Sequence, residues 1–262
     1  MKKIALIGTL LISASTVAHE NSFNISSDNC EVEFQNDVRI SDQDITIENK
    51  ANNKISISRK GEVYVQGERV DLSAAQRQAA SHYSDSLRAE LPKVAEIALD
   101  AVKIAGVALE EVGTALDMDS LKDMHEIMDE LSVEVKNTFY QQNDFVMGEK
   151  TFNEFGDQFS DKFESRLEDA IQSTMFQSVG SLLVTLGSEM ISSGGNMDEF
   201  GERMDRMGKN IDEKVEKQAK VIEARADQLC GDFAALAEQE NTLTAAVPVL
   251  ADYKLFAYKT KI

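Results

Sequence analysis

Residues 30–71 alternate apolar and polar side chains, which is the pattern of β-strands. The runs are short, and turn-forming pairs such as Asn36-Asp37 and Asn52-Asn53 separate them. The predicted strands are CEVEF, DVRI, DITIE, KISIS and EVYVQG. A sheet of this size with one apolar face is too small to be stable alone. We therefore expect a small antiparallel β-meander that packs on helices.

The apolar period changes at Ser73, where a helix is predicted to begin. Ser73 and Gln76 form the S-x-x-Q pattern of a capping box, which satisfies free backbone amides at a helix start. Apolar residues then recur at helical spacing as far as Val112. Pro92 interrupts this run, because proline cannot donate the backbone hydrogen bond of a helix interior. The sequence therefore predicts a kink or a break near Leu91.

Two further helical segments follow. One helix restarts at 117–120, and another begins near Glu149. The second of these opens with an aromatic ridge, in which phenylalanines recur at helical spacing. The ridge consists of Phe152, Phe155, Phe159 and Phe163. Its apolar stripe continues to Met190, and the Ser- and Gly-rich loop at 192–196 is expected to end the helix.

The last helix has the most regular pattern in the chain. Its apolar residues recur every seven positions, as in one helix of a coiled-coil-like pair within a bundle. This apolar seam consists of Val215, Ile222, Leu229, Leu236 and Leu243. Pro248 is expected to stop the helix. Alternation over 253–258 then predicts a last strand beside the N-terminal meander.

Helix outweighs strand and the two are segregated along the chain, so the predicted fold class is α+β, mostly α. The expected organisation is a β-meander over 30–71 packed on a bundle of long helices over 72–262, which ends in the strand-like tail. Because the meander is too small to fold alone, we expect both parts to form one cooperative unit.

The N-terminus has the three parts of a cleavable secretory signal peptide. Two lysines begin it, an apolar run over 4–12 follows, and Thr16 and Ala18 precede the expected cut. Cleavage after Ala18 would leave residues 19–29 as a flexible mature N-terminus; the alternative is an uncleaved anchor. No other segment reaches the ~18 consecutive apolar residues of a membrane span. The sequence therefore predicts a soluble periplasmic protein without a transmembrane anchor.

Acidic residues outnumber basic ones by a wide margin. The chain has 46 Asp and Glu against 27 Lys and Arg, a formal net charge of −19. Without Lys2 and Lys3 of the signal peptide the balance is 25 against 46, a net charge of −21. Such a charge repels nucleic acid and anionic lipid headgroups. The composition therefore argues against nucleic-acid binding and favours solubility.

The chain has two cysteines, Cys30 and Cys230. A small, even number of cysteines in an exported chain favours one structural disulfide. The alternatives are two buried free thiols, an intermolecular bridge, or a metal pair, and the last lacks a nearby His or another Cys. We predict a Cys30–Cys230 disulfide that joins the first strand to the last helix.

Several stretches of the chain together resemble one family of proteins. In the N-terminal part these are Cys30-Glu31-Val32, Asn36-Asp37-Val38, and the run 62–67 leading to Leu72 and Gln76. The C-terminal block is the most specific, and it comprises Ala226–Cys230, Leu236–Glu240, Pro248, Leu250, Tyr253 and Phe256. On these residues the chain resembles the YggN-like family of uncharacterised periplasmic proteins of Gram-negative bacteria. The resemblance implies export and cysteines at these two places, and it lends no site residues.

Short motifs that could carry catalysis or metal binding fail on their spacing. His19 would be the mature N-terminal residue, but a copper brace needs a second His on a rigid scaffold. The run Ser81–Asp85 holds Ser, His and Asp in one helix, whereas a nucleophilic triad converges from different elements. The run 117–120 opens like a calcium loop, but Leu121 and Lys122 replace the next ligand and the glycine. Among 46 carboxylates nothing selects an acid–base pair. We therefore predict no catalytic residue, no metal and no cofactor.

Two segments are rich in small and apolar residues, 102–109 and 178–191. Small residues favour close helix packing in a core, although they could also line a groove for an acyl chain or an apolar peptide. The phenylalanine ridge likewise favours core over a partner-binding groove. Our hypothesis is a non-enzymatic periplasmic binding or envelope-interaction protein, whose partner is an envelope protein, a lipid or an apolar peptide. The alternatives are a periplasmic enzyme whose site only the fold assembles, and a structural spacer.

Overall fold

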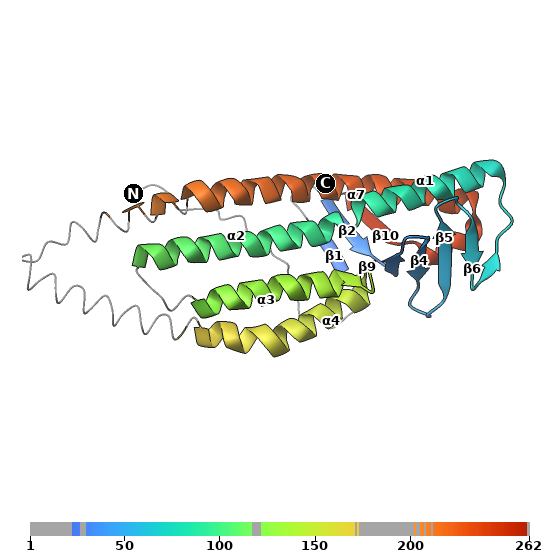
Figure 1. The fold of residues 1–262 in the computed structure, drawn as a ribbon. Coiled ribbons are helices and arrows are strands. Elements are labelled where there is room, and N and C mark those ends of the chain that lie inside the picture. The colour runs from blue at the N-terminus through green and yellow to red at the C-terminus, as the bar shows by residue number, and fades with distance from the viewer. Residues whose placement is uncertain are drawn as a thin grey trace, which may run out of the picture.

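The computed structural model describes residues 23–26, 30–116, 122–170 and 212–260, with isolated positions between 172 and 210. Long helices lie side by side and extend away from a region of short strands (Figure 1). The fold is α+β and mostly helical, as predicted. Among the helices of these ranges, none is long and apolar enough to cross a lipid bilayer.

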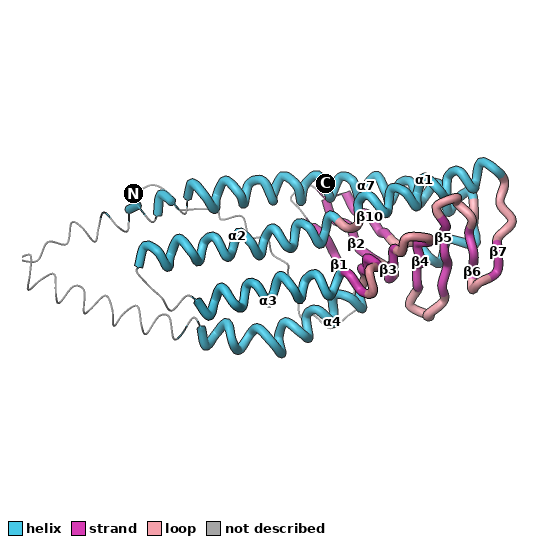
Figure 2. Tube along the Cα trace, in the orientation of Figure 1, coloured by secondary structure: helices cyan, strands magenta, loops and turns pink. Residues whose placement is uncertain are grey.

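The strands form two antiparallel sheets rather than one meander (Figure 2). The smaller sheet has the order β1-β2-β10, and the larger one the order β7-β6-β5-β4-β3-β9-β8. The smaller sheet comprises β1 (Phe23–Ser26), β2 (Cys30–Phe34) and β10 (Phe256–Thr260). The larger sheet comprises β3 (Asp37–Ile40), β4 (Asp44–Glu48), β5 (Lys54–Ser58), β6 (Val63–Val65), β7 (Glu68–Arg69), β8 (Tyr140–Gln141) and β9 (Asp144–Met147).

The predicted C-terminal strand is confirmed, since β10 pairs with β2 in the register Phe256↔Phe34. Two expectations for the N-terminal part were wrong. The run CEVEF does not continue the meander, because β2 pairs with β1 and β10 instead. Within 19–29, which we expected to be flexible, Phe23–Ser26 forms β1, whose backbone groups are satisfied by pairing with β2.

The hairpin β8–β9 joins the larger sheet from between two helices, and the sequence pattern missed it. Gln142 and Asn143 form its turn with φ of 56° and 71°, the left-handed conformation that two-residue hairpins require. Phe145, Val146 and Met147 are buried, and β9 pairs with β3. Three consecutive buried residues do not alternate, so this strand lacks the period-2 signal.

The helix boundaries follow the predicted signals. The capping box of Ser73 and Gln76 is present, and the break at Pro92 separates the first two helices. The helices are α1 (Ala74–Glu90), α2 (Lys93–Leu116), α3 (Lys122–Phe139), α4 (Glu149–Phe159) and α7 (Lys217–Ala246). Short π-helical turns at Ser160–Glu164 and Asp212–Glu216 continue α4 and precede α7, and a 3₁₀ helix at Pro248–Tyr253 follows α7. The predicted restart at 117–120 and the loop at 192–196 lie outside the described residues.

The core confirms four of the five predicted seam residues, and the fifth, Val215, is half-buried in the π-helical turn before α7. Ile222, Leu229, Leu236 and Leu243 are buried, and α7 packs on α1 and α2 of the same chain. Phe233 of α7 also contacts the smaller sheet, where its ring lies 5.6 Å from Phe34 and 5.8 Å from Phe256. The helix therefore carries two buried faces, one toward the bundle and one toward β2 and β10.

The phenylalanine ridge packs against the core in two places; Phe163 is buried, and the other three phenylalanines are half-buried. Phe152 and Phe155 pack on the main core beside the larger sheet. Phe159 and Phe163 belong to a smaller cluster further along the bundle, with Met124 among its buried members. The ridge thus joins the strand region to the helical bundle.

Candidate functional site

Glu240 is the buried acidic residue of the described part of the chain, with 2% of its surface exposed. It lies four residues after Leu236 and three before Leu243, so it occupies the same face of α7 as the apolar seam. Its side chain therefore points into the core, where a charged group needs compensating partners.

Three donors fill both carboxylate oxygens of Glu240. The Tyr83 hydroxyl donates to Oε1 at 2.5 Å, and the Leu255 N–H donates to the same oxygen at 2.6 Å. The Phe256 N–H donates to Oε2 at 3.0 Å. We call this arrangement of Glu240, Tyr83, Leu255 and Phe256 the Glu240 junction. It ties α1, α7 and the start of β10 together.

Tyr83 reaches the junction because of the way α1 is built. The capping box at Ser73 sets the start of the helix, and Tyr83 and Leu87 then follow one another on its buried face. Burial of a tyrosine in a core favours a partner for its hydroxyl, and Glu240 is that partner.

Burial changes the acidity of both side chains. Burial raises the pKa of Glu240 to about 7 from an ordinary 4.5, against the lowering effects of the Tyr83 and backbone hydrogen bonds and of nearby Lys254. Burial and the adjacent carboxylate raise the pKa of Tyr83 well above its usual value. The neutral form of Glu240 is thus favoured over a wider pH range than that of an exposed glutamate.

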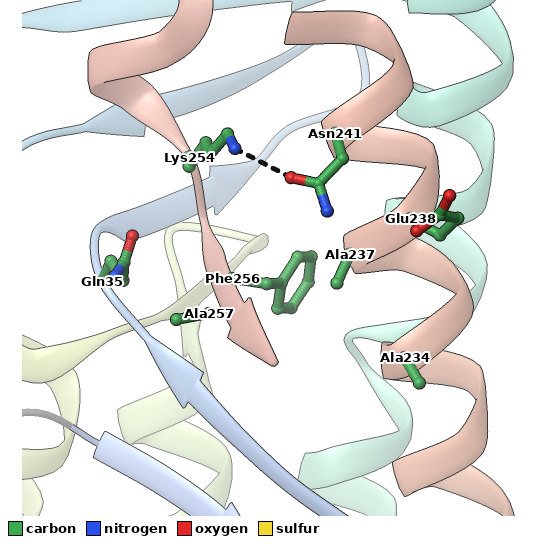
Figure 3. Close-up of a pocket in the computed structure, with 8 residues that line it drawn as sticks. All are labelled: Gln35, Ala234, Ala237, Glu238, Asn241, Lys254, Phe256 and Ala257. Carbon is green, nitrogen blue, oxygen red and sulfur yellow. Dashed lines mark hydrogen bonds between the residues drawn. The ribbon is translucent and has the colours of Figure 1, made fainter. Parts of the chain in front are cut away.

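An open pocket lies beside this junction, between α7 and β10 (Figure 3). Its volume is about 360 Å³. Its apolar lining residues are Ala234, Ala237, Phe256 and Ala257, and its polar ones are Gln35, Glu238, Asn241 and Lys254. Lys254 Nζ donates to Asn241 Oδ1 at 2.8 Å and bridges the two walls (Figure 3).

The polar groups of the pocket do not converge on one point. Gln35 lies beside the β2 end of the pocket, while Glu238 points from the opposite side of α7 (Figure 3). Glu240 is absent from the lining, since its oxygens face protein donors. Polar groups that are spread along the pocket suit the binding of an extended ligand better than catalysis at a single bond of a substrate.

The residues examined as possible catalytic or metal sites do not come together. Ser81 donates to the backbone oxygen of Arg59 at 2.7 Å, while His82 and Asp85 are exposed. In the described part of the chain, no three His, Cys, Asp or Glu side chains gather as a metal site. His19 and the run 117–120 lie outside that part.

The groove that we considered for 102–109 and 178–191 remains a prediction. Residues 102–109 lie on α2 and are half-buried except for exposed Lys103 and Ala105, whereas 178–191 lie outside the described residues. The pocket beside the Glu240 junction is formed by α7, β10 and the end of β2 instead.

Cys230 is buried on α7 and is not a free thiol. The side chain of Cys30, at the start of β2, lies outside the described residues. The two elements are in contact. The Cys30–Cys230 disulfide therefore stays a prediction that the arrangement of β2 and α7 supports.

Sequence reasoning did not single out Glu240 among the carboxylates. A signal was nonetheless present, because Glu240 is an acidic residue at seam spacing from Leu236 and Leu243. Its donors could not be found in this way, since Tyr83 and Leu255 come from other elements.

A family model described as "Protein of unknown function (DUF2884)" matches residues 30–256, from the start of β2 to the start of β10. The chain belongs to this family. All four residues of the Glu240 junction lie within the matched range. The membership agrees with the YggN-like resemblance of the sequence.

The chain is also similar to three curated relatives in Escherichia coli, from strain K12, strain O6:H1 and O157:H7, each named "Uncharacterized protein YggN". Each is 32% identical over 112 residues, which is 43% of this chain and 44% of the relative. The similarity thus spans less than half the length of these relatives. No solved structure matches the chain.

Proposed function

We propose that this DUF2884 protein is exported to the periplasm and acts there as a non-enzymatic binding protein for another protein of the envelope. Export rests on the signal-peptide pattern of residues 1–18. The observation that carries the binding role is the open pocket between α7 and β10. Its alanines leave room for a side chain, and its amides supply hydrogen-bonding groups.

The neighbouring backbone favours an extended peptide as the bound segment. In the described sheet β1-β2-β10, strand β10 is an edge strand. The Phe256 N–H bonds to Glu240 and therefore points away from β2. Because these directions alternate along a strand, the N–H and C=O of Tyr258 also face the free edge. Such groups bind partner segments by strand addition.

An enzymatic role is the second candidate, and one observation favours it. A carboxylic acid with a pKa of about 7 beside a tyrosine is a pair suited to acid–base catalysis. Against this role stands the closure of the junction, since protein donors fill both oxygens and 2% of Glu240 is exposed. A substrate would have to displace β10 to reach it. We therefore favour binding over catalysis.

Site-specific photo-crosslinking in the envelope tests the proposal. A photoreactive phenylalanine analogue replaces Asn241, which lines the pocket, or Ala224, an exposed residue of the same helix that does not line it. We expect one defined envelope protein to crosslink from position 241 and not from 224. Filling the pocket by Ala234→Phe in the same chain should abolish that crosslink. Equal crosslinking from both positions, or none, would contradict the proposal.

The alternative ligands and the enzyme have separate tests. Native mass spectrometry of protein purified from periplasm would reveal a bound lipid or peptide as added mass. For the enzyme, a hydrolysis activity should disappear in Glu240→Gln and persist in Glu223→Gln, a change at an exposed position of the same helix that does not line the pocket. If no protein is crosslinked, added mass would favour a lipid or peptide ligand, and an activity that depends on Glu240 would favour the enzyme. Either result would overturn the proposed function.

A further inference from the structure

The start of β10 is attached to α7 by a side chain rather than by a neighbouring strand. Leu255 and Phe256 are buried, with 0% and 4% exposed, and both of their N–H groups end on the Glu240 carboxylate. The Leu255 C=O faces the other way and accepts from the Gln35 N–H at 3.0 Å. The carboxylate thus accepts the hydrogen bonds that a neighbouring strand would otherwise accept at the start of β10.

Two titratable groups of the described residues face Glu240. Tyr83 approaches from α1, and Lys254 approaches from the segment before β10. The Lys254 amine is already engaged with Asn241 at 2.8 Å. On α7 itself the flanking seam residues Leu236 and Leu243 are apolar. No cation of the described residues forms a salt bridge with the buried carboxylate.

We propose that Glu240 is a proton-controlled latch for the C-terminal strand, which holds β10 closed on α7 when protonated and favours its opening when ionised. Closing removes the carboxyl group from water, and opening returns it to water. Desolvation penalises the ionised form of a buried acid more than the neutral one. The three donors reduce this penalty without cancelling it, because the pKa of Glu240 stays above its ordinary value.

The direction of the pH effect follows from linkage. In the closed state the pKa of Glu240 is about 7, and in an open, hydrated state it returns to about 4.5. Between these two values the closed state keeps a proton that the open state loses. Raising the pH through this window therefore favours opening, and acid favours closure. The full effect on the opening equilibrium is on the order of a hundredfold.

Hydrogen exchange at the Leu255 and Phe256 amides tests the latch in the full mature protein. Exchange would be followed by NMR between pH 5 and pH 8 and corrected for the intrinsic pH dependence of amide exchange. We expect the protection factors of both amides to fall on the order of a hundredfold over this range. Amides in the middle of α7, such as that of Phe233, should not follow the same curve.

Two substitutions separate the latch from a merely structural role. Glu240→Gln removes the titrating group, so the pH dependence of the two amides should vanish. The matched control is Glu223→Gln, a change at an exposed position of the same helix that does not line the pocket, and it should leave that dependence unchanged. Protection that is flat with pH in the unmodified protein, or that keeps its slope in Glu240→Gln, would overturn the proposal.

A second variant keeps the test decisive if Glu240→Gln does not fold. Tyr83→Phe retains the carboxyl group and removes a donor that lowers its pKa. The fall in protection should then begin at the same pH but continue to a higher pH, because only the pKa of the closed state is raised. A fall that ends at the same or a lower pH would show that the carboxylate of Glu240 does not control the strand.

Discussion

Tyr83 and Glu240 lie 157 positions apart in the chain, and the hydroxyl of Tyr83 donates to the Glu240 carboxylate at 2.5 Å. The contact joins the first helix to the last one at the point where β10 begins. It is made inside the core, where leaving a buried polar group without a partner costs about 1–3 kcal/mol. The contact between α1, α7 and the start of β10 therefore depends on this one carboxyl group.

The free energy of unfolding should carry a pH dependence from Glu240. Its pKa is raised to about 7 in the folded protein from 4.5, so its contribution is fully present below 4.5 and is lost as the pH rises through 7. From pH 5 to pH 8 the loss amounts to about 2–3 kcal/mol. Urea denaturation at both pH values would give the free energy of unfolding of the unmodified protein and of Glu240→Gln. The value for the unmodified protein minus that for the variant should fall between pH 5 and pH 8. A rise in this difference with pH would contradict the prediction.

Truncation of the α7 seam should destabilise the protein strongly. Leu236 is 1% exposed, so Leu236→Ala removes buried methyl groups and leaves a cavity, at a cost of about 2–5 kcal/mol. Val221 lies on the same helix and is 56% exposed, so Val221→Ala should change the free energy of unfolding by less than about 0.5 kcal/mol. Denaturant midpoints at constant m-value would measure both. Equal effects would mean that the seam is not the buried face.

The turn between β5 and β6 should tolerate no side chain at Gly61. Its φ is +72°, and an added Cβ would lie 1.8 Å from the backbone oxygen of Arg77 on α1. Gly61→Ala should therefore cost about 3 kcal/mol or more, since it combines an unfavourable φ with a backbone clash. Gly67 also has a positive φ, of +84°, but has no atom within 4 Å of its added Cβ. Gly67→Ala should cost only about 1–2 kcal/mol in a thermal or urea melt.

The predicted disulfide should appear as one Cys30–Cys230 peptide in non-reducing peptide mapping. Cys30 begins β2 and Cys230 lies on α7, and these two elements are in contact. The Phe34 ring packs on Phe233, which lies one helical turn from Cys230. Reduction should lower the free energy of unfolding by about 2–5 kcal/mol. Labelling of two thiols in the oxidised, denatured protein would disprove the bridge.

The exported protein should begin at His19. The basic residues, the apolar run and the small residues before the cut predict cleavage after Ala18. Intact-mass measurement of protein from the periplasmic fraction would show the mature N-terminus directly. As a control, Ala18→Arg should block cleavage and leave the precursor mass. A mass that includes Met1 in the unmodified protein would contradict the prediction.

Features that depend on neighbouring residues were predictable from the sequence. The capping box at Ser73, the break at Pro92 and the buried seam of α7 all follow from patterns within a few turns of one helix. The alternating tail likewise predicted β10 and its place beside the N-terminal strands. Local backbone propensity and apolar period are properties of short segments, so they can be read without knowing the fold.

The partition of the strands into two sheets was not predictable in this way. The run CEVEF has the same alternation as the strands that follow it, yet β2 pairs with β1 and β10. Pairing partners far apart in the sequence are chosen by the face that can be buried against α7, where Phe34 meets Phe233. Alternation shows that a segment is a strand and not which strand lies beside it.

The sequence by itself determined the helices, the apolar seam, the class of fold and the expectation of export. Only the tertiary structure decided which acidic residue of its described part is buried. Glu240 differs from the others because Tyr83 and the amides of Leu255 and Phe256 surround it in a site closed to water. The acidity of a carboxyl group depends on the solvent and donors around it in space. Those surroundings come from three separate elements, and they exist only once α1, α7 and β10 have packed together.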